Sequence, residues 1–183
     1  MRKILVIGSG KSASYLIKYF LDKSESDNLH ITIGDISSKN AKKLIGNHKN
    51  ANAITLDVFD KTSRSNAIST ADIVVSMLPA RFHIEVAKDC IKFGKNMVTA
   101  SYVSEEMKAL DASAKNKDLI FMNEIGVDPG IDHMSAMQVI DKIRDKGGEI
   151  ILFESFTGGL VAPESDNNLW NYKFTWNPRN VVV

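Results

Sequence analysis

The sequence predicts an α/β protein with a doubly wound parallel sheet, followed by the beginning of a second, α+β domain. Strand-like apolar runs alternate with helical patterns through the first two-thirds of the 183 residues, which is typical of parallel strands joined by crossover helices. The first strand ends in a glycine-rich turn that opens a helix. After Glu124 the alternation stops and turn-forming residues become frequent. We therefore expect one domain over residues 1–125 and the beginning of another over residues 126–183.

The six expected strands are short and apolar, and many of their residues are β-branched. They cover about residues 3–8, 30–35, 53–58, 72–78, 96–100 and 119–123. The helices between them carry apolar residues at helical spacing, and they cover about residues 12–21, 38–45, 61–69, 84–93 and 104–117. Pro79 ends the fourth strand, and Gly94 is typical of the position after a helix C-terminus.

The residues from 126 onward have a different pattern. The stretch DPG at residues 128–130 predicts a turn, and a helix is expected over about residues 132–146, where Gly147 and Gly148 end it. EIILFESF, at residues 149–156, predicts a strand of a sheet that is covered on one side. The remainder is rich in Gly, Pro, Asn and aromatic residues, and it indicates the opening of a second domain.

The turn after the first strand reads GSGKSA, and its ending resembles that of an ATP-binding P-loop. A P-loop needs another glycine five positions before Gly10, but that position is Leu5, which lies within the expected strand. The Rossmann fingerprint for dinucleotides, G-x-G-x-x-G/A after a first strand, fits Gly8, Gly10 and Ala13. A tight turn without a ligand is the alternative, but strand, spacing and a later acidic residue together favour a nucleotide site.

Composition and charge argue against several classes of protein. Lys and Arg number 23 against 22 Asp and Glu, the net charge is +1, and no basic cluster predicts a nucleic-acid partner. The single cysteine, Cys90, has no internal disulfide partner, and a small buried hydrophobe is favoured over a nucleophile. The apolar runs are too short for a signal peptide or a membrane span, so a cytoplasmic location is expected. No metal is expected, because no metal-ligand spacing is present.

Asp35 ends the second strand, 22 residues beyond Ala13, near the spacing at which an acidic residue binds the ribose in a dinucleotide fold. A carboxylate there accepts hydrogen bonds from the ribose hydroxyls and repels a 2′-phosphate. No arginine accompanies it, since Ile36 and Ser37 follow. The sequence therefore predicts NAD rather than NADP; a plain helix cap is the other interpretation of Asp35.

Ligands of an open parallel sheet bind at the carboxyl ends of its strands, so the substrate site is expected there. Asp128 is the carboxylate best placed to meet a substrate amine at the domain junction, although ordering the DPG turn is as good an interpretation. Tyr102 is expected either to hydrogen-bond a substrate carboxylate or to cover the sheet end. His133 is expected to be a structural hydrogen-bonder rather than a general base.

Three stretches, VTASYVS, MNEIGVDPGIDHMSA and GGLVAPESDNNLWNYKFTWNPR, resemble the glutamate-forming saccharopine dehydrogenases, and the resemblance runs through all 183 residues. It implies an oxidoreductase of lysine metabolism that interconverts saccharopine with glutamate and 2-aminoadipate 6-semialdehyde. NADP-using members carry an arginine where this chain has Ile36, which agrees with the expectation of NAD. The resemblance implies cofactor contacts at Gly8, Ser9, Gly10, Lys11, Asp35, Ile36, Ser37, Asp57, Val58 and Leu78. It implies that Ser101, Tyr102 and Asp128 contact both the cofactor and the substrate.

Saccharopine carries three carboxylates, which arginines usually orient. Arg2 and Arg64 are expected to be remote from the site or on a surface helix, and only Arg81, Arg144 and Arg179 remain. Members of the family are far longer than this chain, so we expect the chain to bind NAD(H) but to turn over poorly. Two alternatives stay open: a carboxynorspermidine-type dehydrogenase acting on another amino-acid imine, and a non-catalytic NAD-sensing domain. A homodimer is compatible with either.

Overall fold

The computed structural model describes residues 1–159 and 161–173, so the expectation for Arg179 lies outside the described residues. The chain divides into two compact units, Met1–Met134 and a second that begins at Ser135. The first unit carries the sheet. The domain boundary at residue 125 and the roles of the two domains stay predictions.

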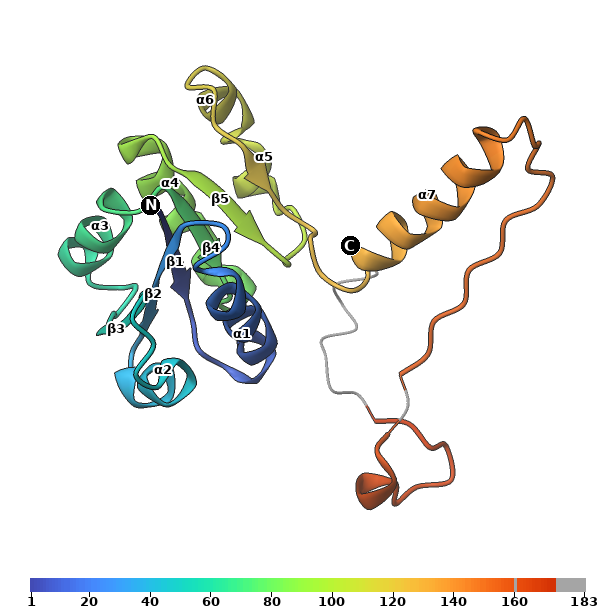
Figure 1. Ribbon diagram of the computed structural model, residues 1–183, viewed down its shortest axis with the longest axis horizontal. Helices are drawn as coiled ribbons and strands as arrows, with labels where there is room; N and C mark the ends of the chain where they lie inside the picture. Colours follow the sequence, from blue (N-terminus) through green and yellow to red (C-terminus); the bar gives the residue numbers. More distant parts are fainter. Residues whose placement is uncertain (160, 174–183) are drawn as a thin grey trace. The chain divides into compact units, whose positions relative to one another are not determined.

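The first unit is built on a six-stranded parallel sheet in the order β3-β2-β1-β4-β5-β6 (Figure 1). The strands are β1 (Arg2–Ile7), β2 (Leu29–Asp35), β3 (Ala51–Thr55), β4 (Ile73–Ser76), β5 (Asn96–Thr99) and β6 (Phe121–Met122). The chain runs outward from β1 in one direction to β3 and then crosses to β4 on the other side of β1. This is the predicted doubly wound Rossmann fold, with its switch point between β1 and β4.

Two apolar cores lie on opposite faces of the sheet, because successive side chains of a strand point to opposite faces. Leu5 and Ile7 of β1 belong to one core, together with residues of α3 (Lys61–Ser69) and α4 (His83–Phe93). Ile4 and Val6 belong to the other, together with residues of α1 (Ser14–Lys23) and α2 (Ser38–Ile45). β1 is therefore buried on both faces, which explains its continuous apolar sequence.

The helix ends follow from local sequence. Asp60 caps α3 by accepting hydrogen bonds from the backbone N–H groups of Thr62 and Ser63. Gly94 ends α4 in the left-handed region, at φ 65°, as the sequence predicts. The remaining helices are α5 (Glu105–Lys108), α6 (Asp111–Lys115) and α7 (Ile131–Arg144), with 3-10 turns at Lys11–Ala13, Ala80–Phe82 and Pro163–Ser165. None of the helices within the described residues is long and apolar enough to cross a membrane.

Several expected elements have different bounds in the structure, and two of these differences have a local cause. β3 ends at Thr55 instead of residue 58, because the next residues turn: the Asp57 carboxylate accepts a hydrogen bond from the Phe59 N–H at 2.9 Å. The helix expected over residues 104–117 is divided into α5 and α6. The break lies at Leu110, whose N–H donates to the Met107 carbonyl, three residues back, instead of the one four back.

The strand expected at residues 149–156 is wrong, since none of these residues is assigned to a strand. Ile151 is 92% exposed and Phe156 88% exposed. A strand needs partners for its backbone hydrogen bonds, and the described residues supply no neighbouring strand here. Apolar alternation alone therefore did not produce a strand.

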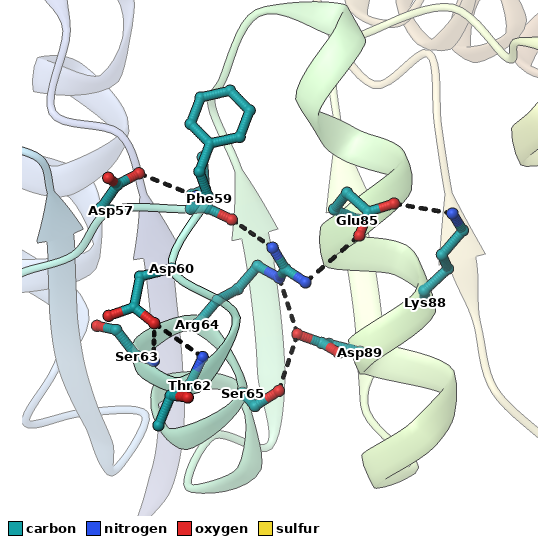
Figure 2. Close-up of polar contacts among 11 residues, drawn as sticks. Asp57, Phe59, Asp60, Thr62, Ser63, Arg64, Ser65, Glu85, Lys88 and Asp89 are labelled. Atoms are coloured by element: carbon teal, nitrogen blue, oxygen red, sulfur yellow. Dashed lines mark hydrogen bonds and ion pairs between the residues drawn. The ribbon is translucent and has the colours of Figure 1, made fainter.

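Cys90 and Arg64 are both buried, although only the first was expected to be. Cys90 is fully buried in α4, and burial raises the pKa of its thiol to about 12, so the prediction of a buried hydrophobe is confirmed. Arg64, expected on a surface helix, is 4% exposed. Its Nε donates to the Asp89 carboxylate at 2.8 Å, and Nη1 donates to the Val58 carbonyl (Figure 2). α3 turns this guanidinium inward against α4.

Replacing Arg64 tests the contribution of this buried pair to stability. Arg64→Met leaves the Asp89 carboxylate buried without its cation, so the free energy of unfolding should fall by about 3–5 kcal/mol. Lys18→Met is the matched control, because Lys18 and Asp22 also form a cation–carboxylate pair, but on the exposed surface of α1. This substitution should lower the free energy of unfolding by less than about 1 kcal/mol. Denaturant unfolding measures both, and equal losses would contradict this account.

Candidate functional site

The turn after β1 requires glycine at its first position. Gly8 is buried with φ +106°, and a Cβ built on it would lie 2.9 Å from the Met77 carbonyl oxygen. Both the backbone conformation and this close approach exclude a larger residue. Gly8 therefore holds the turn against the end of β4.

Gly10, unlike Gly8, is not required by the backbone or by close packing. Its φ is −67°, and a Cβ added there would meet no protein atom within 4 Å. Nothing in the fold demands glycine at Gly10, so the space beside its backbone is open to a ligand. Lys11 beside it is exposed, whereas Ala13 is buried against the sheet.

The Asp35 carboxylate at the end of β2 is bound to the turn after β1. Oδ2 accepts hydrogen bonds from the Ser9 N–H and the Ser9 hydroxyl, both at 2.7 Å, and Oδ1 accepts one from the Ser37 N–H at 3.2 Å. Partial burial opposes ionisation of Asp35, but these hydrogen bonds outweigh it and hold the pKa of the carboxyl below its usual value. Asp35 is therefore an ionised group that joins two strand ends.

A pocket of about 270 Å³ opens at the carboxyl ends of β1, β2, β3 and β4. It includes six residues that the sequence assigned to the cofactor: Gly8, Asp35, Ile36, Asp57, Val58 and Leu78. Sequence reasoning missed its other walls, Ile7, Gly34, Leu56, Phe59 and Phe82. The two phenylalanine rings contact each other edge to face, with centroids 4.9 Å apart. The apolar lining suits a planar aromatic ring.

The wall that follows β3 is fixed by polar contacts from outside the pocket (Figure 2). Arg64 donates to the Val58 carbonyl and to the Asp89 carboxylate, and its Nη2 lies 3.4 Å from a Glu85 carboxylate oxygen. Ser65 also donates to Asp89, at 3.1 Å. The pocket wall at Val58 is thereby linked to α4.

Ser101, Tyr102 and Asp128 lie in a second region at the same edge, beyond the end of β5. Ser101 is half-buried, while Tyr102 and Asp128 are exposed. The segment that carries Asp128 is attached to the end of β5, because the Glu124 N–H donates to the Ser101 carbonyl at 3.1 Å. No hydrogen bond joins these three side chains to one another within residues 1–159 and 161–173. The structure brings them to one edge but not into mutual contact.

His83, at the start of α4, was missed by sequence reasoning. It is 3% exposed, and its ring reaches hydroxyls at the ends of β4 and β5: Nδ1 lies 2.8 Å from Ser76 Oγ and Nε2 lies 2.7 Å from Ser101 Oγ. Burial lowers the pKa of the imidazole. No motif signals this position, because the contacts join three separate segments.

His133 lies in the first turn of α7, with Nδ1 2.8 Å from the Asp132 carboxylate. The hydrogen bond that His133 donates to the Asp132 carboxylate, and the negative charge of that carboxylate, raise the pKa of His133. This contact agrees with the structural role expected for His133. Among the described residues, no group of three or more His, Cys, Asp or Glu side chains could hold a metal ion.

Two family models match the chain. The saccharopine dehydrogenase NADP binding domain matches residues 4–122, and the saccharopine dehydrogenase C-terminal domain matches residues 126–183. A saccharopine dehydrogenase [NADP(+), L-glutamate-forming] of Schizosaccharomyces pombe is 40% identical over 183 residues. The α-aminoadipic semialdehyde synthase of Bos taurus, named as mitochondrial, is 38% identical over the same length.

The solved apo structure of saccharopine dehydrogenase (L-Glu forming) from Saccharomyces cerevisiae has a TM-score of 0.80 and 35% identity to this chain. It is matched over 100% of this chain and 40% of its own length. The chain likewise spans 40% of the Schizosaccharomyces pombe relative and 19% of the Bos taurus relative.

The expectation of NAD rather than NADP is wrong. The matching family model is an NADP binding domain, and the Schizosaccharomyces pombe relative is named for NADP(+). The physical error was to treat Asp35 as a free acceptor for ribose hydroxyls. Three hydrogen bonds from Ser9 and Ser37 give this carboxylate a role within the fold, so its presence at the end of β2 does not by itself decide between the two cofactors.

Two family models cover residues 4–122 and 126–183. They agree with the motifs in the sequence and with the Rossmann sheet and its glycine turn. The chain belongs to the saccharopine dehydrogenase family.

Proposed function

We propose that this chain provides the NADP(H)-binding domain and part of the substrate domain of a glutamate-forming saccharopine dehydrogenase. The carrying observation is the pocket at the switch point, which combines an open glycine turn with an apolar cavity of about 270 Å³. The names of the relatives supply the cofactor and the substrate. A cytoplasmic location and a homodimer stay predictions.

The residues of the pocket fit a dinucleotide. The open backbone at Gly10 and the first turn of the helix that follows suit a pyrophosphate, because helix N-terminal N–H groups favour anions. Leu56, Val58 and Leu78 give the apolar walls that an adenine ring needs. Ser37 and Lys39, exposed just after β2, are the polar and cationic groups beside the ribose position. They are our candidates for the 2′-phosphate, since Ile36 occupies the arginine position.

The reaction requires a hydride acceptor, which the nicotinamide ring supplies when bound. Removal of hydride from the C–N carbon of saccharopine leaves an imine, and water cleaves it to glutamate and 2-aminoadipate 6-semialdehyde. The secondary ammonium of the substrate must lose its proton before transfer. Asp128, exposed beside the β5 end, is our candidate to orient that amine, and the hydroxyls of Ser101 and Tyr102 are candidates to hold the substrate.

The two glycines of the turn should respond differently to the same substitution. Gly10→Ala should leave the free energy of unfolding unchanged but weaken NADPH binding by about tenfold, or about 1.4 kcal/mol, because the new methyl group occupies the space of the pyrophosphate. Gly8→Ala should destabilise the fold itself by about 1–3 kcal/mol. NADPH titration and denaturant unfolding measure both, and normal NADPH affinity of Gly10→Ala would oppose the proposed site.

Cofactor choice is tested by titrating the protein with NADPH and NADH. We expect NADPH to bind more tightly. Ile36→Arg should strengthen NADPH binding by about tenfold or more, because a charge-assisted hydrogen bond to the 2′-phosphate contributes about 1.5–3 kcal/mol. NADH affinity, which involves no such phosphate, serves as the control and should not change. Tighter binding of NADH by the unaltered protein would contradict the proposal.

Asp128→Asn tests the substrate role. In the complete gene product the substitution should lower the turnover of saccharopine by roughly 10²-fold, since the carboxylate that orients the amine is lost, while NADPH affinity stays the same. Asp145→Asn removes another exposed carboxylate, just after α7, and should change neither quantity. Unchanged turnover of the Asp128 variant would remove this residue from the site. NADPH binding without any saccharopine oxidation by the unaltered gene product would favour a sensing role.

A further inference from the structure

His83 links two strand ends at the carboxyl edge of the sheet. Its imidazole is 3% exposed and lies between Ser76, the last residue of β4, and Ser101, two residues beyond β5. The distances are 2.8 Å from Nδ1 to Ser76 Oγ and 2.7 Å from Nε2 to Ser101 Oγ. A third hydroxyl, that of Thr99, lies 3.3 Å from Nε2. Of the three hydroxyl residues, only Ser101 is more than 2% exposed.

The position of the ring proton follows from satisfying these buried hydroxyls. Ser76 is 1% exposed, and its Oγ has His83 Nδ1 as its single acceptor among the described residues. If Nδ1 carried the proton, the hydrogen of Ser76 would have no acceptor, and Ser101 and Thr99 would compete for the one lone pair of Nε2. With the proton on Nε2, Ser76 donates to Nδ1, and Nε2–H donates to Ser101 Oγ. In this second tautomer only the Thr99 hydrogen is buried without an acceptor among the described residues, because the hydrogen of the half-buried Ser101 can turn toward solvent. In the first, Ser101 at 2.7 Å takes the Nε2 lone pair, and the hydrogens of both Ser76 and Thr99 are buried without an acceptor.

This arrangement determines what the Ser101 hydroxyl offers to a ligand. Its oxygen accepts a hydrogen bond from His83 in this tautomer. Because Ser101 is only half-buried, the hydrogen of its hydroxyl is free to turn toward the accessible side. Without His83, the hydroxyl would rotate freely, and ordering it on binding would oppose association. The lowered pKa of the buried ring agrees with a neutral imidazole that keeps one N–H.

We propose that His83 is a positioning residue: through Nε2–H it fixes the Ser101 hydroxyl as a hydrogen-bond donor to an oxygen acceptor of the bound ligands. That acceptor is either a substrate carboxylate or the carboxamide oxygen of the cofactor. The proposal rests on the proposed function for its ligands. His83 transfers no proton in this role; it only sets the direction of its hydrogen bond with Ser101.

A double-mutant cycle in the complete gene product tests the coupling. Ser101→Ala should lower kcat/KM for saccharopine by about tenfold or more, the usual effect of losing a hydrogen bond to a charged acceptor. His83→Leu should cause a similar loss alone and little further loss when Ser101 is already Ala, because it acts through that hydroxyl. His83→Gln, whose amide can still donate toward Ser101, should retain more activity than His83→Leu. Losses that multiply in the double variant would overturn the proposal.

The same variants distinguish the two possible acceptors and control for folding. A larger KM for saccharopine with unchanged NADPH affinity identifies the substrate carboxylate, and weaker NADPH binding identifies the carboxamide. If neither quantity changes in Ser101→Ala, the proposal is wrong. His30→Leu is the matched control. His30 lies near the amino end of β2, away from the carboxyl edge of the sheet, and contacts Asn52. This substitution should leave all these quantities unchanged.

A second measurement does not depend on turnover. Nitrogen NMR of the imidazoles in the 183-residue chain should show the Nε2–H tautomer of His83 at neutral pH, assigned by the signal that His83→Gln removes. An Nδ1–H tautomer would overturn the proposal even in an active enzyme. A gene product that fails to oxidise saccharopine would instead defeat the proposed function, and the NMR result would still decide where the hydrogen lies.

Discussion

The hydrogen bonds from Ser9 to the Asp35 carboxylate are the constraint on which the nucleotide site depends. β1 and β2 are neighbours in the sheet, but their pairing ends near Ile7 and Gly34, before the glycine turn begins. Two donors on Ser9, both 2.7 Å from one oxygen of Asp35, extend the attachment beyond the last strand pair. Since the carboxylate stays ionised, this attachment is charge-assisted. It holds the turn so that the backbone at Gly10 faces open space.

A second constraint acts on the opposite wall of the pocket. The Leu56 N–H still donates to the Asp35 carbonyl of β2, at 2.8 Å, and beyond it the chain is held by the guanidinium of Arg64, which donates to the Val58 carbonyl. Arg64 is in turn held by Asp89 of α4, at 2.8 Å. A buried pair of this kind adds little net stability over apolar packing, but it fixes a geometry. The pocket is therefore shaped by polar contacts between segments far apart in the sequence, while its lining is apolar.

The features that could be predicted from the sequence are those with local causes. Gly8 and Gly94 mark backbone conformations that only glycine adopts easily, and the residues next to each of them show where to expect a turn or a helix end. The burial of Arg64 could not be predicted, because its partner lies 25 residues away on another helix. Residues 149–156 alternate like a strand but lack a strand beside them. Asp35 was located correctly, yet its hydrogen bonds depend on the fold, and so the cofactor prediction failed.

His83 and Asp128, both near the end of β5, have different chemical capacities. The proposed reaction would need a group that exchanges a proton with a substrate amine, and such a group must be reachable by solvent and able to change its charge. His83 meets neither condition, because it is 3% exposed and burial lowers its pKa. Asp128 is exposed and carries a carboxylate. For the proposed reaction, the exposed Asp128 on the segment after β6 is therefore a better candidate for a role at the substrate amine than His83 is, and the buried ring between β4 and β5 is suited to hold a neighbouring hydroxyl in place. The carboxylate of Asp128 thus lies in an exposed position and not in the apolar core, where its charge would be disfavoured.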